Sequence, residues 1–434
     1  MAERVFTCSA GSFSGVEEND CINISPIRYA TCERFGEPKP YVYKKGVHKL
    51  NERCPICVQL DSKIDTFLSG TKYEKAKQLE DPQVLAITVP KNVKTNEKLP
   101  VMVWFHGGAY INGGTAFYDR TLFAKEQRVI MVGVNYRLGI LGFSKNRNGE
   151  LANNGVLDAI EAMRWVNNNI EAFGGDPKNI TIFGISAGAD IVRCFILSRV
   201  TGPLFRRAII QSDPALLTIK KDKIDKQILD KVNSIPLDAP IEEYKKAQGY
   251  LLKHIKARSI AKYMPFGPHF GVYPLPKVED IEERIKVVAH QHELLIGTTR
   301  RESSLFLAAN KHFRRLGYLN PWVREKIIRY YTHKVFEKPS EEFAILFGKA
   351  GGTVYTYDFL WQLHRKHTFL GACHTIDTLA LFGPRYYKDD SVMLMGMKKE
   401  EIIEEGKPLR AVWSDFARTG KIELREIADM VKFN

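Results

Sequence analysis

Residues 181–188 read TIFGISAG, and this stretch decides the fold. The apolar run 180–183 ends in a Gly-x-Ser-x-Gly motif, and a run compatible with a helix follows at 189–198. Such a tight turn from strand to helix strains the backbone of the serine, Ser186, and pushes its hydroxyl clear of the sheet. Glycines two residues to either side avoid collisions, and the following helix start favours negative charge nearby. The stretch therefore predicts a nucleophilic serine rather than a chance match in a turn.

Short apolar, β-branched runs alternate with longer helical patterns along the rest of the chain. This alternation predicts a mainly parallel sheet that is covered by helices on both faces. No linker, repeat or low-complexity tract interrupts it, so we expect one α/β domain over 1–434, with helical insertions at about 218–290 and 307–345. The expected strands are 101–105, 129–134, 180–183, 208–210, 294–296 and 354–359, and a helix is expected at 155–173.

Composition narrows the class of protein. The 434 residues are 44% hydrophobic and 26% charged, as in ordinary globular enzymes. The net charge of +14 is spread along the chain, which predicts a basic, solvated surface. No zinc-ligand spacing or RNA-binding signature accompanies it, so no nucleic-acid partner is expected.

Cysteine usage and the N-terminus predict a cytoplasmic protein. Seven cysteines, an odd number spread thinly, do not make a disulfide framework. The CxxC at Cys54 and Cys57 lacks a second pair to complete a zinc site, so we interpret it as incidental. Residues 1–15 lack the pattern of a signal peptide, and no apolar run is long enough for stable membrane insertion.

A second glycine-containing turn lies upstream, where residues 103–110 read VWFHGGAY. Glycines expose backbone N–H groups and let a substrate carbonyl approach. Two N–H groups from this turn, together with that of Ala187, would form an oxyanion hole.

A serine hydroxyl needs a base, and the base needs a carboxylate that orients it. His374 follows the strand expected at 354–359, and Glu302 follows the one expected at 294–296. Both therefore fall at the carboxyl ends of strands, where the active site of an open α/β sheet lies. The order serine, acid, histidine is that of α/β-hydrolases. Other candidates stay open on pattern alone: His364 and His367 as bases, and Asp358 and Asp377 as acids.

Several blocks of the sequence resemble the type-B carboxylesterase/lipase family, which includes cholinesterases and bacterial para-nitrobenzyl-type esterases. The resemblance runs from about residue 10 to 420 and is most specific in its centre. The central blocks are NYRLG at 135–139, NGVLD at 154–158, FGGDP at 173–177 and FGISAGA at 183–189.

The resemblance implies an α/β-hydrolase fold and hydrolysis of small-molecule carboxylic esters through an acyl-enzyme, without metal or cofactor. Ser186 matches the nucleophile, Glu302 the acid and His374 the base. In the same way Gly108, Ala109 and Ala187 match the oxyanion donors, and Ser212 matches a serine that supports the catalytic acid.

The chain departs from the family pattern in four places, and one of them is Pro82, which stands where a cysteine of the family's first disulfide is expected. Ile185 replaces the glutamate that usually precedes the nucleophile, which removes a buried carboxylate. Arg301 precedes Glu302, and would favour its ionised form if the guanidinium points inward. The segment between Glu302 and His374 is short for the family, so we expect a more open pocket than that of a cholinesterase.

Two alternatives to an esterase are considered. The first is a catalytically silent binding protein on the same fold, since fold does not determine function. Ser186 and the absence of an export signal argue against it, whereas Ile185 and Arg301 keep it open. The second keeps the chemistry but changes the substrate to an amide, thioester or carbamate.

Overall fold

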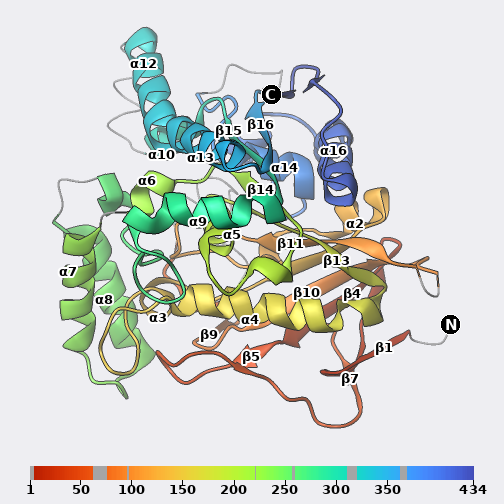
Figure 1. Cartoon of the computed structure of the whole chain (residues 1–434), viewed down its shortest axis with the longest axis horizontal. Coiled ribbons are helices and arrows are strands. Elements are labelled where there is room, and N and C mark those ends of the chain that lie inside the picture. The colour runs from red at the N-terminus through yellow and green to blue at the C-terminus, as the bar shows by residue number, and fades with distance from the viewer. Residues whose placement is uncertain are drawn as a thin grey trace.

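The computed structural model describes residues 4–61, 76–94, 97–219, 221–256, 260–309, 320–361 and 369–434. Their centre is a sheet in which six adjacent strands run parallel and antiparallel strands extend both edges (Figure 1). Each of the six strands expected from the sequence is one of the parallel strands, so the expected α/β fold is confirmed. In spatial order the strands are β17 (Glu426–Ile427), β18 (Val431–Phe433), β16 (Thr353–Phe359), β15 (Glu293–Thr299), β14 (Arg207–Gln211), β13 (Gly175–Ile185), β11 (Leu99–Phe105), β12 (Ile130–Val134), β10 (Val84–Pro90), β4 (Cys21–Arg28) and β3 (Val16–Glu18).

Helices bury both faces of this sheet. Along β11, Met102 and Trp104 belong to one apolar cluster, and Val101, Val103 and Phe105 belong to the other. Because successive side chains of a strand point to opposite faces, this division marks the two sides of the sheet. The first side is covered by α2 (Thr121–Gln127), α14 (Ile376–Phe382) and α16 (Lys407–Thr419), and the second by α4 (Asn154–Asn169), α5 (Ala187–Leu197), α9 (Ile281–Val288) and α13 (Lys338–Lys349).

The helix expected at 155–173 consists of two parts. α4 ends at Asn169, and one turn of 3₁₀-helix, Ile170–Phe173, follows it. Gly174 then adopts a left-handed conformation, with φ of 86°, which ends the helix and leads into β13.

The segments expected as insertions are helical where they are described. The first contains α7 (Asp222–Asn233) and α8 (Ile241–His254), which pack together at one end of the molecule (Figure 1). The second contains α12 (Pro321–Thr332), a π-helix (His333–Glu337) and α13. The grouping of all these elements into a single domain stays a prediction. The other α-helices of the described ranges are α3 (Gly139–Gly142), α6 (Ala215–Thr218), α10 (Glu302–Ala309) and α15 (Lys399–Glu405).

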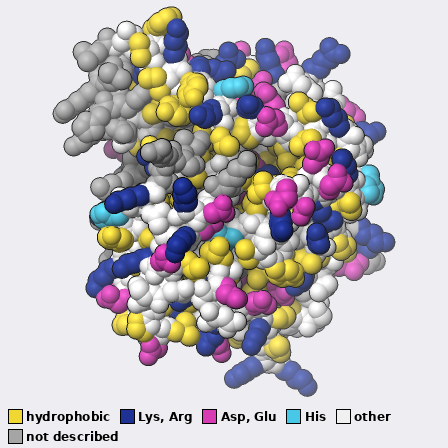
Figure 2. All heavy atoms as spheres, turned by 60° about the vertical axis from the view of Figure 1, so that its left-hand side comes forward, with side chains coloured by type: hydrophobic (Ala, Val, Ile, Leu, Met, Phe, Trp, Pro, Cys, Tyr) yellow, Lys and Arg dark blue, Asp and Glu magenta, His cyan; other side chains and the backbone are white. Residues whose placement is uncertain are grey.

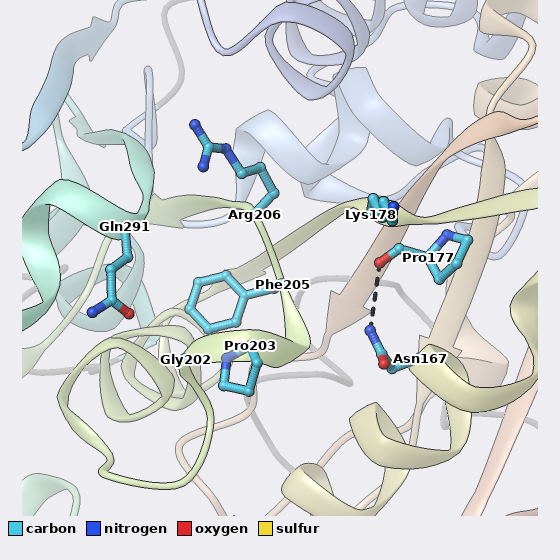
Figure 3. A pocket seen from close by; sticks show the side chains of 8 residues that line it. All are labelled: Asn167, Pro177, Lys178, Gly202, Pro203, Phe205, Arg206 and Gln291. Carbon is cyan, nitrogen blue, oxygen red and sulfur yellow. Dashed lines mark hydrogen bonds between the residues drawn. The ribbon is translucent and has the colours of Figure 1, made fainter.

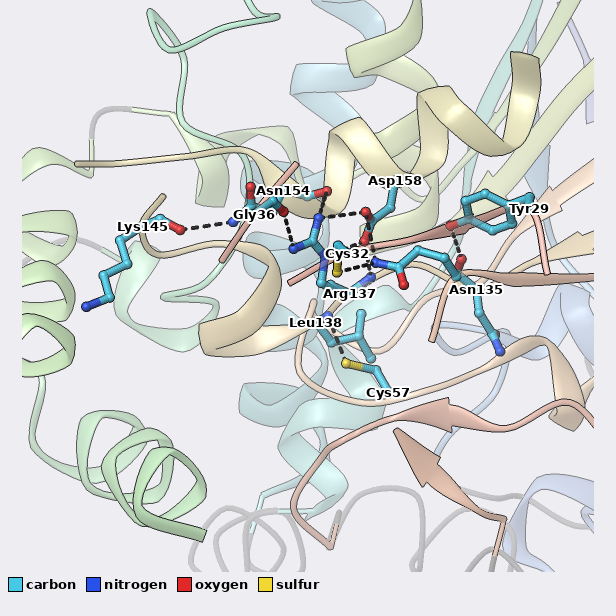
Figure 4. A network of polar contacts seen from close by, with 11 residues as sticks. Tyr29, Cys32, Gly36, Cys57, Asn135, Arg137, Leu138, Lys145, Asn154 and Asp158 are labelled. Atoms are coloured by element: carbon cyan, nitrogen blue, oxygen red, sulfur yellow. Dashed lines mark hydrogen bonds and ion pairs between the residues drawn. The ribbon is translucent and has the colours of Figure 1, made fainter. Parts of the chain in front are cut away.

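A buried ion pair joins α4 to the loop after β12 (Figure 4). Arg137 and Asp158 are both at most 1% exposed, and two guanidinium nitrogens donate to the two carboxylate oxygens at 2.7 Å. Arg137 also donates to the carbonyl of Gly36 at 2.7 Å. Two residues further on, the N–H of Gly139 donates to the carbonyl of Tyr110 at 2.6 Å. The ion pair therefore stabilises a loop that contacts the turn at 107–112.

The surface carries basic and acidic side chains side by side (Figure 2). On the face shown, lysine and arginine are scattered among aspartate and glutamate, as expected for a solvated surface. All seven cysteines lie in described ranges and each is free. Within the described ranges, no helix combines the length and the hydrophobicity that crossing a bilayer requires.

Candidate active site

Ser186 lies in the turn between β13 and α5, as expected from the sequence. Its backbone has φ of 55° and ψ of −123°, a combination that side-chain-bearing residues rarely adopt, so the expected strain is confirmed. A Cβ on Gly188 would lie 2.0 Å from the carbonyl oxygen of Phe105, and one on Gly184 would lie 2.5 Å from that of Gly188. Glycine is therefore required on both sides of the serine, because β11 passes directly beneath the turn.

The glycine turn after β11 lies against Ser186. A Cβ built on Gly107 would be 3.3 Å from the Cβ of Ser186. Gly108 and Ala109 have φ of 113° and 52°, which turns the chain back on itself. Among the described residues, the backbone N–H groups of Gly108, Ala109 and Ala187 have no recorded hydrogen-bond acceptor. That these three N–H groups form an oxyanion hole stays a prediction.

Glu302 and His374, 72 residues apart in the chain, form a buried hydrogen-bonded pair. Nδ1 of His374 lies 2.5 Å from Oε2 of Glu302, and the two side chains are 3% and 0% exposed. Oε1 of Glu302 accepts the backbone N–H of Thr299 at 2.7 Å. Both carboxylate oxygens of Glu302 are thus engaged, one of them by Nδ1 of His374. Their roles as acid and base stay a prediction.

Gln211, at the end of β14, connects this pair to the serine turn. Its carbonyl accepts the N–H of Ser186 at 3.0 Å, and its side-chain amide donates to Asp377 at 2.6 Å. Asp377 lies three residues after His374. Gln211 therefore binds both the serine turn and the segment that carries His374. Among the described residues, no hydrogen bond is recorded between the Ser186 hydroxyl and His374. Hydrogen bonds of this kind are often long in the free enzyme and tighten when substrate binds.

Among the described residues, neither rival acid has a hydrogen bond to His374. Asp377 accepts from Gln211 and from the N–H of Thr378, and burial raises its pKa to about 6. Asp358 is exposed on β16. The rival bases His364 and His367 lie outside the described residues.

The departures from the family pattern have structural outcomes. Arg301 does not point toward Glu302; it pairs with Glu325 and donates to the carbonyls of Phe369 and Leu370. Ile185 is 1% exposed and packs in the apolar cluster beneath the sheet. The hydroxyl of Ser212 is buried with no recorded partner, so its supporting role stays a prediction. The expected openness of the pocket also stays a prediction, because 310–319 and 362–368 fall in that segment and are not described.

Two features of the site were not expected from the sequence. The rings of Phe306, on α10, and Phe336 each lie 5.2 Å from the imidazole of His374. Inside the protein, Arg193 of α5 pairs with Asp190 of the same helix and with Asp213. The sequence contains a signal for this cluster, because Asp190 and Arg193 interrupt an otherwise apolar helix.

A separate cavity of about 510 Å³ lies at the far end of the strands (Figure 3). It opens beside the start of β13 and β14, whereas Ser186 follows the carboxyl end of β13. The cavity therefore does not belong to the site around Ser186. Its lining residues are Asn167, Pro177, Lys178, Gly202, Pro203, Phe205, Arg206 and Gln291.

Comparison with known proteins identifies the family of the chain. The model of the carboxylesterase family matches residues 4–316. A probable N-octanoylanthranilate hydrolase from Rhodococcus erythropolis is 33% identical over 96% of this chain and 94% of its own length. A para-nitrobenzyl esterase from Bacillus subtilis is 29% identical over 97% and 91%.

Solved structures agree as well. A thermophilic para-nitrobenzyl esterase aligns over 100% of this chain and 98% of its own, with a TM-score of 0.79 and 24% identity, and so shares the fold. A carboxylesterase from Geobacillus stearothermophilus aligns over 98% and 92%, with a TM-score of 0.73 and 28% identity. The chain belongs to the carboxylesterase family and is a carboxylic ester hydrolase.

Proposed function

We propose that Ser186, His374 and Glu302 form the catalytic triad of this esterase and that hydrolysis passes through an acyl-enzyme on Ser186. The observation that carries the proposal is the buried hydrogen bond between Glu302 and His374. The segment that carries His374 is hydrogen-bonded to Gln211, which also binds the serine turn. A strained serine, an oriented imidazole and three free N–H donors supply the nucleophile, base and oxyanion stabilisation that acyl transfer needs.

The reaction follows from these positions. Oγ of Ser186 attacks the carbonyl carbon of the ester while Nε2 of His374 takes the hydroxyl proton. The carbonyl oxygen becomes an oxyanion that accepts hydrogen bonds from the N–H groups of Gly108, Ala109 and Ala187. Collapse of this intermediate breaks the ester bond, and His374 gives its proton to the departing alcohol. Water then attacks the acyl-enzyme by the same route and releases the carboxylic acid and free Ser186.

The first prediction concerns the nucleophile. Purified protein should hydrolyse short para-nitrophenyl esters, and a fluorophosphonate probe should label Ser186 at one equivalent. Ser186→Ala should lose both, because no other hydroxyl lies in the serine turn. Hydrolysis that survives Ser186→Ala would contradict the proposal, and absence of both hydrolysis and labelling in the wild type would favour the silent binding protein.

A second candidate reaction, hydrolysis of N-acyl aromatic amines, is supported by the 33% identical relative and by the ring environment of His374. His374 protonates the leaving group, so Phe306 and Phe336 flank the side where an aromatic amine would depart. The test compares octanoyl anilides, with and without an ortho-carboxylate, against the matched phenyl octanoate. A kcat/KM for the carboxylated anilide equal to or above that of the ester would support amide hydrolysis.

A further inference from the structure

We propose that Tyr110 is a positioning residue for the oxyanion hole: its hydroxyl, bound to Asp190 of the nucleophile helix, holds the preceding N–H of Ala109 in place. The inference rests on the proposed function and adds to it a buried hydrogen-bonded network that the catalytic steps do not themselves use.

The backbone at 109–110 needs an external restraint. Ala109 and Tyr110 have φ of 52° and 61°, and two consecutive left-handed residues other than glycine are costly. Within the turn, the N–H groups of Ile111 and Asn112 both donate to the carbonyl of Gly108 at 3.0 Å. Because the Gly108 carbonyl and the Ala109 N–H share one peptide plane, these bonds fix the direction of that N–H within the turn. The position of the whole turn relative to Ser186 then depends on how Tyr110 is held.

Tyr110 is held by its carbonyl, which accepts the N–H of Gly139 at 2.6 Å, and by its side chain. The ring is 0% exposed and packs on Phe143 with ring centroids 4.5 Å apart. The hydroxyl donates to Oδ2 of Asp190 at 2.8 Å. Burial, together with the charge of Asp190, raises the pKa of Tyr110 well above its usual value. The phenol thus stays neutral and remains a donor to the carboxylate.

Asp190 belongs to the helix that starts at the nucleophile. Its backbone N–H donates to the carbonyl of Ser186 at 3.0 Å, one turn along α5. The Tyr110–Asp190 bond therefore ties the oxyanion turn to the same helical turn that fixes Ser186. A shift of either partner would change the distance between the serine oxygen and the Ala109 N–H.

Arg193 fixes Asp190 in turn. Its guanidinium pairs with Oδ1 of Asp190, donates to Oδ2 of Asp213 at 2.8 Å and to the hydroxyl of Thr218 at 3.0 Å. All of these side chains are buried, so water does not compete for their bonds. Since Asp213 follows Ser212 at the end of β14, the network joins three segments that meet at Ser186.

The test removes one hydroxyl. Tyr110→Phe should lower kcat for a para-nitrophenyl ester about tenfold, less than loss of a whole oxyanion donor, while KM changes less than about twofold. Affinity for a trifluoromethyl ketone, which forms an oxyanion on Ser186, should fall in parallel with kcat/KM. Tyr29→Phe is the matched control, because Tyr29 is also 0% exposed and donates to a backbone carbonyl, that of Asn135, at 2.7 Å.

Two variants of Asp190 test the inference independently, in case Tyr110→Phe folds poorly. Asp190→Asn keeps an oxygen for Tyr110 and should retain more of kcat than Asp190→Leu, which has a similar shape but no acceptor. Equal losses in these two variants, or a Tyr110→Phe loss no larger than that of Tyr29→Phe, would overturn the inference while wild-type activity upholds the proposed function. A wild type that neither turns over ester nor reacts with fluorophosphonate would overturn both.

Discussion

At the scale of single residues, the structure distinguishes two buried carboxylates that the sequence leaves as rival candidates for the acid. Glu302 binds His374 directly, whereas Asp377 binds Gln211 and the backbone. We therefore expect Glu302→Gln to lower kcat by about 10³-fold or more, because the amide no longer stabilises the imidazolium or selects its tautomer. Asp377→Asn, a change of the same kind 75 residues away in the chain, should stay within about tenfold of wild type. Steady-state kinetics on one ester decides between them, and the reverse ranking would make Asp377 the acid.

At the same scale, the burial of Asp213 leads us to expect that the stability of the protein depends on pH. Burial, and the nearby Asp190 carboxylate, raise its pKa from the usual value near 4 to about 7. Between these values the folded protein holds a proton that the unfolded chain releases, so stability should fall as pH rises from about 4 to about 7. Asp213→Asn cannot ionise, and its unfolding temperature should decline less over this range. Parallel pH profiles for the two proteins would contradict the raised pKa.

At the scale of elements, the contact between β11 and α5 positions Ser186. A Cβ on Gly188 would overlap the carbonyl of Phe105, which belongs to a buried central strand that cannot move away. Gly188→Ala should therefore lower the unfolding temperature by several degrees and reduce fluorophosphonate labelling. Gly249→Ala is the matched control in α8, where, of the residues that the structure describes, the added Cβ would meet only Leu60 at 3.5 Å. It should raise stability by about 0.5–1 kcal/mol, because glycine weakens a helix interior.

At the scale of the whole molecule, the Arg137–Asp158 pair joins α4, the loop after β12 and the N-terminal segment at Gly36. Removing one member of a buried ion pair leaves the other charge unpaired, which costs about 3–5 kcal/mol. Asp158→Ala should lower the unfolding temperature clearly in thermal scans. Asp230→Ala, which breaks an exposed pair with Lys226 on α7, should change stability by less than about 0.5 kcal/mol. Similar effects from both would mean that the Asp158 site relaxes and admits water.

Local sequence was enough for the fold class, the six parallel strands and the strained turn at Ser186. Each depends on features that a short window contains: apolar runs bounded by breakers, and glycines spaced around a serine. The same windows could not reveal that Arg301 turns away from Glu302 toward Glu325, because that direction is set by a helix 24 residues further along.

What only the tertiary structure decided is which distant side chains meet. Glu302 and His374 are brought together by adjacent strands β15 and β16, and Asp190, Arg193 and Asp213 by the packing of α5 against β14. Pairing over such separations depends on strand order and helix packing, which no local pattern encodes. The sequence alone thus determined what kinds of residues are available for acyl transfer. The fold determined that Glu302 is the carboxylate that binds His374 and that Tyr110 binds Asp190.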